Sequence, residues 1–388
     1  MSPVELNSLR WIYFTYLGSV GIMATFFPVH FASLGFTAFQ IGLLFAVRTA
    51  ISIVGQPWIT AAADRSGRPL RWLRVSLFGA LLIAAGLPWA STFVLVAALL
   101  WLQTPLQTST IPLLDARLVT AGGHTVWSGV RLWGSIGYGL CVGAFGLWMA
   151  QATDESVIGQ RAVQAYLLLA LLGCLAALPL RDRAVEGLRS PPRSLGMLLK
   201  LPGLPRFFAA HAMHWAAVMI FNVFIALHVA ARGESALVTG TAVALAIVGE
   251  VVAFRWASRL LPPGTAAGWM PAVFAVSAVR WLVTAWAPSA AWLIGVQALH
   301  FLSFGVWFAA AMIQLGERVE AHERASLQGL FMAATFGVGG MLGTLAGGAV
   351  ADGPGGLPAA FFLAAILEAI ALLLLVPDMV RRLRDRLR

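Results

Sequence analysis

The sequence predicts an all-α integral membrane protein with twelve transmembrane helices in two six-helix bundles. Hydrophobic residues make up 60% of the 388 residues and charged residues only 11%, whereas a soluble domain carries roughly 25% charged residues. Apolar stretches recur along the whole chain, and each is long enough to cross a hydrocarbon core about 30 Å thick, which takes about 20 helical residues. A basic segment near the middle of the chain separates the first six stretches from the last six.

The apolar stretches are the expected helices in chain order. They are residues 10–34, 38–63, 71–90, 93–118, 129–150, 162–180, 206–230, 237–256, 267–286, 289–313, 325–350 and 358–377. The first stretch is too long for the core of a signal peptide, and no small-residue cleavage site follows it. We therefore expect it to remain as the first transmembrane helix.

The central segment and a glycine pattern give the domain organisation. The segment contains basic residues and four prolines in a turn-rich composition, which favours a cytoplasmic linker. Matched glycine-rich runs, GSIGYGLCVGAFG in the fifth stretch and GVGGMLGTLAGG in the eleventh, indicate close helix packing and an internal repeat. The expected parts are an N-terminal bundle, a linker, a C-terminal bundle and a basic cytoplasmic tail, at 1–180, 181–205, 206–380 and 381–388.

The net charge of +10 is concentrated on one side of the predicted membrane. Of the 26 Lys and Arg residues, 21 fall in one set of alternate loops and the two termini, against Arg161 and Arg232 in the other set. The positive-inside rule then places both termini in the cytoplasm. This arrangement explains the positive charge without a nucleic-acid partner.

Ionisable residues inside the predicted spans cost roughly 2.5–3.5 kcal/mol each to insert and usually mark a pathway. The candidates are Arg48, Asp115, Arg131, Glu250, Arg280 and Glu368, with His214 and His300. With Glu368 set aside on a helix expected to be peripheral, three arginines accompany two acids, and a slightly positive cavity suits a monoanion. A guanidinium is a bidentate partner for a carboxylate. Arg131 is therefore the candidate substrate ligand, paired with Asp115 in the empty site.

Two alternatives to this assignment stay open. The Asp115–Arg131 pair could be permanent and structural, or Asp115 could belong with the cytoplasmic arginines Arg65 and Arg68.

The loop after the second helix, AAADRSGRPLR, resembles the cytoplasmic signature of the major facilitator superfamily, with Thr60 where that family usually has a glycine. The resemblance implies a conformational latch. Asp64 would face the N-terminus of the eleventh helix, where unpaired N–H groups favour a carboxylate. Gly67 would make the turn, and Arg65 and Arg68 would pair with acids on neighbouring helices. An ordinary basic loop is the alternative.

A closer resemblance lies in the fourth and fifth helices. IPLLDA with Asp115 and VRLWGSIGY with Arg131 resemble the lactose permease family, which implies that both residues bind substrate and that Tyr138 stacks against it. Tryptophans adjoin two of the interior arginines, and Trp133 and Trp281 are cavity candidates that could stack on a planar substrate, with packing as the alternative.

The same resemblance extends to the C-terminal half. Glu250, Arg280 and His300 are similar in helix and order to that family's residues for substrate affinity and proton coupling, and Ser303 stands where the family has a further acid. Glu250 beside Arg280 and His300 is therefore the expected proton-coupling group. A Glu250–Arg280 bridge that never titrates is the alternative.

Segments along the whole chain, among them YFTYLGSVGI, VGEVVAF and QALHFLSFG, resemble the phenylpropionate permease branch of the superfamily. That resemblance implies proton-coupled uptake of a small molecule, with an aromatic carboxylate such as 3-phenylpropionate as the best candidate, by alternating access at a site between the bundles. It makes His214 a substrate-binding residue of the cavity. We expect the protein to need no cofactor, with the proton gradient as its energy source. We also expect it to be a monomer in a bacterial-type inner membrane.

Other functions stay as alternatives. A sugar or nucleoside symporter and a drug:proton efflux antiporter would share this architecture, although the fifth helix lacks the proline that an efflux protein typically carries there. His211, His214 and Met219 are a weak metal-binding signal, and a membrane sensor would bind without flux. The sequence shows no arrangement of a nucleophile, a general base and oxyanion donors, and no nucleotide-binding loop. Nothing in it therefore indicates an enzyme. Arg48 is a further cavity candidate without a motif.

Overall fold

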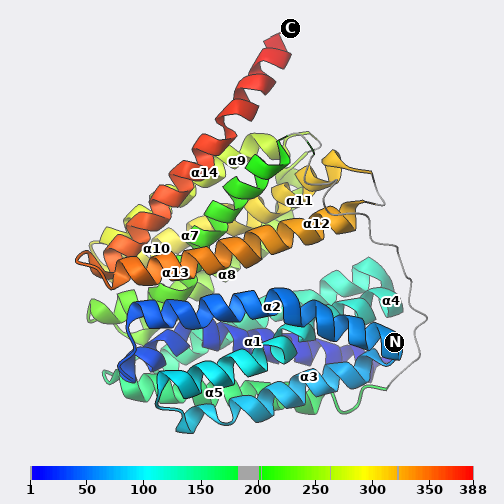
Figure 1. Ribbon diagram of the computed structural model, residues 1–388, viewed down its shortest axis with the longest axis vertical. Helices are drawn as coiled ribbons and strands as arrows, with labels where there is room; N and C mark the ends of the chain where they lie inside the picture. Colours follow the sequence, from blue (N-terminus) through cyan, green and yellow to red (C-terminus); the bar gives the residue numbers. More distant parts are fainter. Residues whose placement is uncertain (1, 182–200, 202, 263, 321–322, 388) are drawn as a thin grey trace. The chain divides into compact units, whose positions relative to one another are not determined.

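The computed structural model describes residues 2–181, 201, 203–262, 264–320 and 323–387, and every regular element in those ranges is helical (Figure 1). Twelve of its helical segments are long and apolar enough to cross a membrane. The predicted fold class is therefore confirmed. Residues 182–200 and 202 of the predicted linker, and Arg388 of the predicted tail, lie outside the described residues.

Contacts group the described residues into two units. Unit 1 comprises Met1–Arg189 with Ile225–Ile247, and unit 2 comprises Ser190–Phe224 with Val248–Arg388. The grouping departs from the predicted bundles 1–180 and 206–380 at residues 225–247, and those bundles stay a prediction.

The helices divide between the two units in chain order. Unit 1 contains α1 (Pro3–Ser33), α2 (Ala38–Ser66), α3 (Pro69–Ala84), the 3₁₀ turn η1 (Leu87–Trp89), α4 (Phe93–Trp148) and α5 (Glu155–Ala176). Two helices, α7 (Leu204–Ala231) and α8 (Ala236–Leu260), contribute to both units. Unit 2 contains α9 (Ala266–Trp286), α10 (Ala290–Gly295), η2 (Val296–Leu299), η3 (Phe301–Val306), α11 (Trp307–Arg318), α12 (Arg324–Met332), η4 (Ala333–Gly339), α13 (Gly340–Ala351) and α14 (Gly356–Leu387).

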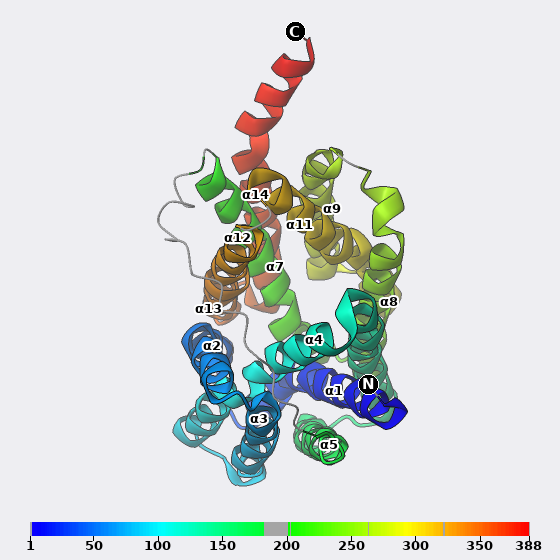
Figure 2. The ribbon, with the colours of Figure 1, turned by 90° about the vertical axis from the view of Figure 1, so that its right-hand side faces the viewer.

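In unit 1, α1 is the central helix. It contacts α4 and α5, while α2 and α3 contact α4 (Figures 1 and 2). α2 begins with a capping box of Thr37 and Gln40 and ends at Gly67, whose φ of 62° lies in the left-handed region that glycine adopts without strain. These caps fix both ends of the helix that carries the predicted latch.

The sixth span begins earlier than hydropathy predicts, at Glu155 of α5 instead of residue 162. Asp154 caps this helix, because its Oδ1 accepts a hydrogen bond from the Ser156 N–H at 2.8 Å. Hydrogen bonds from Ser156 hold the pKa of Asp154 below its usual range. A side-chain cap satisfies an N–H group that the first turn leaves unpaired. The helix therefore extends beyond the apolar stretch into polar sequence.

α4 is one helical run that supplies two spans, Phe93–Leu118 and Gly129–Trp148. Twelve residues of a straight helix cover roughly 18 Å, yet Nε1 of Trp127 lies 2.7 Å from Oδ1 of Asp115. The run therefore folds back between these two residues. This return brings the fourth and fifth predicted helices side by side.

Glycines of the fifth and eleventh spans place each span against the first helix of its own half. A Cβ atom on Gly137 of α4 would overlap the backbone of Phe14 in α1, and one on Gly343 of α13 would overlap the backbone of Ala216 in α7. The matched glycine runs thus make the same backbone contact in both units. This is the close packing that small residues permit between membrane helices.

Unit 2 is organised around α9 and α14. α9 contacts α14 and α11, and α13 contacts α14. The tenth and eleventh spans each contain a π-helical segment, η3 and η4. Such wide turns are frequent at functional sites. One of them, η3, carries Ser303 and directly follows His300.

Candidate functional site

Two polar clusters lie inside the spans, and the first, in unit 1, contains Asp115 and Arg131. The Tyr13 hydroxyl and the Trp127 indole N–H both donate to Oδ1 of Asp115, the latter at 2.7 Å. Nη1 of Arg131 lies 3.5 Å from Oδ2 of Asp115, and the two side chains are 46% and 28% exposed. Such a long, partly exposed ion pair contributes little to stability. The guanidinium therefore keeps most of its donors for another anion.

The aromatic candidates on α4 differ in their relation to Arg131. Tyr138 is half-buried and follows Arg131 by two helical turns, so both lie on one face of the helix. Its ring packs over Gly21 of α1, where a Cβ atom would lie 3.1 Å from Cγ of Tyr138. Trp133 is exposed and lies about 200° around the helix from Arg131. Of these two rings, Tyr138 is the one that shares a helix face with Arg131, and its role toward a substrate stays a prediction.

Arg48, for which the sequence offers no motif, joins a neutral network in unit 1. Its Nη2 donates to Oε1 of Gln107 at 2.6 Å, and Nε2 of Gln107 donates to the Tyr166 hydroxyl at 3.1 Å. The Tyr16 hydroxyl donates to the backbone oxygen of Gln107 at 2.7 Å. Sequence reasoning missed Gln107, although a glutamine in an apolar span is itself a signal. Gln103, fully buried one turn earlier on α4, repeats that signal.

In unit 2 the Arg280 side chain is fully buried, and its N–H groups donate to uncharged side chains. Nε and Nη2 donate to Oε1 of Gln297 at 2.9 and 2.7 Å. Nη1 donates to Nδ1 of His300 at 2.9 Å and to Oγ of Ser303 at 2.7 Å. The guanidinium carbon lies 4.3 Å from the centroid of the Trp281 ring, a cation–π contact. All three nitrogens of the Arg280 guanidinium are therefore engaged, in four hydrogen bonds.

Glu250 of α8 is half-buried and is not among the groups that contact Arg280. The structure thus brings Arg280 and His300 together, as their order along the chain suggests, without the Glu250–Arg280 bridge that was the alternative. The coupling role of Glu250 stays a prediction.

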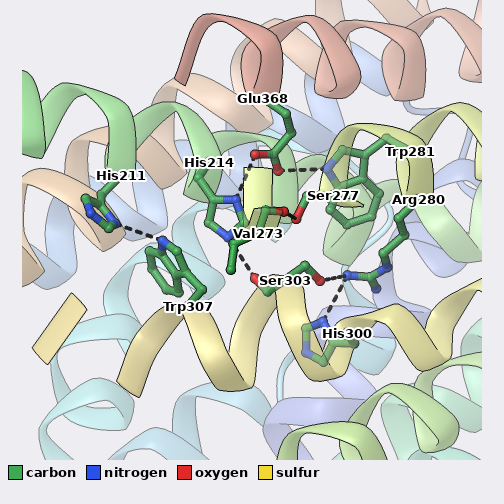
Figure 3. Close-up of polar contacts among 10 residues, drawn as sticks. All are labelled: His211, His214, Val273, Ser277, Arg280, Trp281, His300, Ser303, Trp307 and Glu368. Atoms are coloured by element: carbon green, nitrogen blue, oxygen red, sulfur yellow. Dashed lines mark hydrogen bonds and ion pairs between the residues drawn. The ribbon is translucent and has the colours of Figure 1, made fainter. Parts of the chain in front are cut away.

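The acid that does lie in this cluster is Glu368, so its exclusion from the set of interior charges is wrong. Glu368 is fully buried. Its Oε2 lies 2.9 Å from Nδ1 of His214, and its Oε1 accepts a hydrogen bond from the Trp281 indole N–H at 3.0 Å. Nε2 of His214 lies 2.7 Å from the backbone oxygen of Ser303. Figure 3 shows the four side chains converging from α7, α9, η3 and α14.

Glu368 lies inside because of the face of α14 that carries it. Ala360, Ala364 and Ala371 are fully buried, and their spacing to Glu368 places all four on one side of the helix. Small side chains let α14 approach α9 closely, so the carboxyl group reaches the interior of unit 2. This run of alanines at helical spacing is the signal in the sequence that identifies the buried face.

His214 therefore has both ring nitrogens engaged inside unit 2. His211, one turn earlier on α7, accepts a hydrogen bond at Nδ1 from the Trp307 indole N–H at 2.8 Å (Figure 3). The two histidines share a helix face, but they bond to different partners. Among the described residues no group of three or more metal-ligating side chains occurs.

The side chains of the predicted latch are exposed. Asp64, Arg65 and Arg68 make no side-chain hydrogen bond or ion pair to described residues, and Gly67 forms the left-handed end of α2. The helix that Asp64 is expected to face belongs to unit 2, so the latch stays a prediction.

Comparisons with known proteins agree with this architecture. The MFS_1 like family matches residues 6–363. The chain is 28% identical over 342 residues to the probable 3-phenylpropionic acid transporter of Escherichia coli (strain K12), covering 86% of this chain and 88% of that protein. It is 24% identical over 312 residues to the maltose permease of Geobacillus stearothermophilus, covering 79% of this chain and 78% of the permease.

Solved structures resemble the chain over nearly its whole length. A mutant of the nucleoside transporter NupG has a TM-score of 0.84 at 15% identity, covering 95% of this chain and 98% of that one. An inward-facing, occupied bacterial homologue of the human lysosomal transporter Spinster has a TM-score of 0.78 at 14% identity, covering 99% of both chains. At these identities the structural matches establish the fold alone.

Proposed function

The chain belongs to the MFS_1 like family and is a multi-pass membrane transporter, not an enzyme, and we propose that it takes up an aromatic carboxylate such as 3-phenylpropionate together with protons. Arg131 carries this proposal. Its side chain is 46% exposed, and its ion pair to Asp115 is 3.5 Å long. A buried arginine in a saturated network, such as Arg280, has no comparable capacity.

The surroundings of Asp115 support an exchange of partners at Arg131. Oδ1 of Asp115 already accepts hydrogen bonds from Tyr13 and Trp127. When Arg131 turns to a substrate carboxylate, Asp115 therefore keeps two donors and is not left unsatisfied. The substrate carboxylate would take two parallel N–H bonds from the guanidinium, and the Tyr138 ring would lie against its aromatic body.

The remaining elements of the proposal follow from family and charge pattern. Uptake would proceed by alternating access with the proton gradient as the energy source and no cofactor. The side with most Lys and Arg residues would be cytoplasmic, with both termini there, in a bacterial-type inner membrane. The working unit would be a monomer.

One relative supports a second candidate, a proton-coupled sugar symporter. The maltose permease matches nearly four fifths of the chain. A sugar lacks the anionic group that Arg131 is placed to bind, so the two candidates differ in their need for this residue. A nucleoside symporter and a drug efflux antiporter are further outcomes of the same test.

The test is uptake of labelled substrate and external pH change in proteoliposomes with an imposed pH gradient. 3-Phenylpropionate, cinnamate, maltose and a nucleoside are added in turn to wild type, Arg131→Ala, Arg131→Lys and Arg161→Ala. Arg161 is the matched control, because it is an exposed arginine of unit 1 that bonds to Gln164 outside the cluster. Protein-free vesicles measure passive entry of the weak acids.

We expect the external medium to become alkaline when the aromatic acids are added and not when maltose or the nucleoside is added. Arg131→Ala should lose this response, and Arg161→Ala should retain it. Arg131→Lys should lose most uptake as well, because an ammonium does not form the two parallel bonds. Alkalinisation with maltose or the nucleoside, or uptake of the acids that survives Arg131→Ala, would reject the carboxylate proposal. Substrate-driven acidification would indicate efflux.

A further inference from the structure

The contact between His214 and Glu368 must contain a proton. The backbone oxygen of Ser303 can only accept, so Nε2 of His214, 2.7 Å away, carries a hydrogen. Nδ1 of His214 faces Oε2 of Glu368 at 2.9 Å. Two groups without a hydrogen would repel at that distance. Either His214 is an imidazolium beside a carboxylate, or a neutral imidazole accepts from a protonated Glu368, and both descriptions place one proton in the contact.

Burial determines what the loss of this proton would do locally. Glu368, His214 and Trp281 are fully buried. With the proton, the pair is neutral overall. Without it, the pair bears one negative charge in a site closed to water, which is unfavourable unless a cation lies close by.

Arg280 is that cation, and it is linked to the pair on two sides. Trp281 donates its indole N–H to Glu368, while its ring faces the Arg280 guanidinium. Ser303 accepts from Nη1 of Arg280 through Oγ and from His214 through its backbone oxygen. The combined network therefore has one net positive charge with the proton and no net charge without it. Proton loss is compensated by a charge already present.

Other titratable groups around the pair are held neutral by the bonds they accept. His300 accepts from Arg280 at Nδ1, and His211 accepts from Trp307 at Nδ1, so neither is an imidazolium. α13, which packs on α14, contains no titratable side chain. Among the described groups bonded to the pair, the exchangeable proton therefore lies in the His214–Glu368 contact. α8, which packs against η3 where Gly305 meets Ala253, carries one further acid, Glu250.

We propose that His214 and Glu368 form the proton-binding site of this transporter, and that Ser303 on the π-helical segment η3 links their protonation to the Arg280–His300 cluster. One proton leaves the contact between Nδ1 and Oε2 and is replaced in each cycle, with no other bond made or broken. The inference rests on the proposed proton symport and replaces Glu250 as the expected carrier.

Glu368→Gln is the decisive variant. Its amide can donate to Nδ1 of a neutral His214 and accept from Trp281, so it imitates the protonated state without changing the packing. Proteoliposomes with this variant should exchange labelled internal for external substrate at a rate close to wild type. They should lose accumulation driven by a pH gradient. Glu317→Gln is the matched control, because Glu317 is an exposed acid of α11 in unit 2, and it should retain both.

A second measurement needs no substrate, which separates failure of this site from failure of the carboxylate proposal. Infrared difference spectra of substrate-free protein over a pH series report carboxyl and imidazole protonation. Exposed acids titrate in every variant, so the expected result is a titrating component that wild type and Glu317→Gln share and that Glu368→Gln lacks. If the spectra of wild type and Glu368→Gln titrate alike, or if Glu317→Gln also lacks the component, the proposal is overturned. If Glu368→Gln is not recovered folded, His214→Gln replaces it in both measurements.

Discussion

Units 1 and 2 each hold an arginine and an acid inside the membrane, but they hold them in opposite ways. In unit 1, Arg131 and Asp115 are partly exposed and 3.5 Å apart. In unit 2, Arg280 and Glu368 are fully buried, and each is bonded to neighbours that are themselves bonded. If the two proposals above are correct, the loose pair exchanges a partner for a ligand and the closed network exchanges a proton. Substrate and proton would then bind in different units.

The largest expected effect tests this contrast on stability. Arg280→Leu leaves His300, Ser303 and Gln297 without their donor and removes the compensating charge, which should cost about 3–5 kcal/mol. Arg131→Leu breaks a long, partly exposed pair and should cost at most about 1 kcal/mol. Thermal unfolding in detergent measures both variants beside Arg161→Leu. Equal losses of stability in Arg280→Leu and Arg131→Leu would show that the buried network and the exposed pair contribute alike to folding.

A smaller effect tests the charge on Glu368. Trp281→Phe removes a hydrogen bond to a carboxyl oxygen, worth about 1.5–3 kcal/mol if that group is ionised. Trp307→Phe is the matched change, because it removes an indole bond to the neutral His211, worth about 0.5–1.5 kcal/mol. Chemical denaturation of both variants gives the difference. The same loss of unfolding free energy in Trp281→Phe and Trp307→Phe would indicate that Glu368 is protonated and therefore uncharged.

The last comparison examines the helix packing that the two units share. Gly137→Ala and Gly343→Ala each force a Cβ atom against the backbone of a neighbouring helix, and each should cost about 1–3 kcal/mol. Gly129→Ala meets nothing within 4 Å and should be neutral or more stable, by up to about 1 kcal/mol. The thermal midpoints of the three variants provide the measurement. A loss at only one of the two packed positions would refute the structural repeat.

Much of the fold could be predicted because lipid imposes it. Backbone groups in a bilayer must be paired within the helix, so an apolar run of sufficient length has one structure available. The start of α5 at Glu155 departs from that rule, because the Asp154 cap continues the helix into polar sequence. Hydropathy has no information about such a cap.

The candidate site was less predictable, and the reason differs between units. Asp115 and Arg131 meet because α4 folds back. The sequence implies this return, because it predicts the fourth and fifth spans as antiparallel neighbours. Glu368 lies in the most hydropathic of the twelve spans, 154 residues from His214, and no motif surrounds it. Its partner depends on which face of α14 packs inward. Ser303 stands where the resembling permeases have an acid, and the carboxyl group of this cluster comes from α14 instead.

The backbone contact between Gly137 and Phe14 constrains how unit 1 can move. No side chain lies between α1 and the second span of α4 at that point, so neither helix can shift by changing a rotamer. We therefore expect α1 and the second span of α4 to move together, with Tyr13 and Arg131 attached to them. We expect a ligand that draws the Arg131 side chain away from Asp115 to transmit force to α1 as well, so that the turn of this side chain is accompanied by a rotation of the two joined helices.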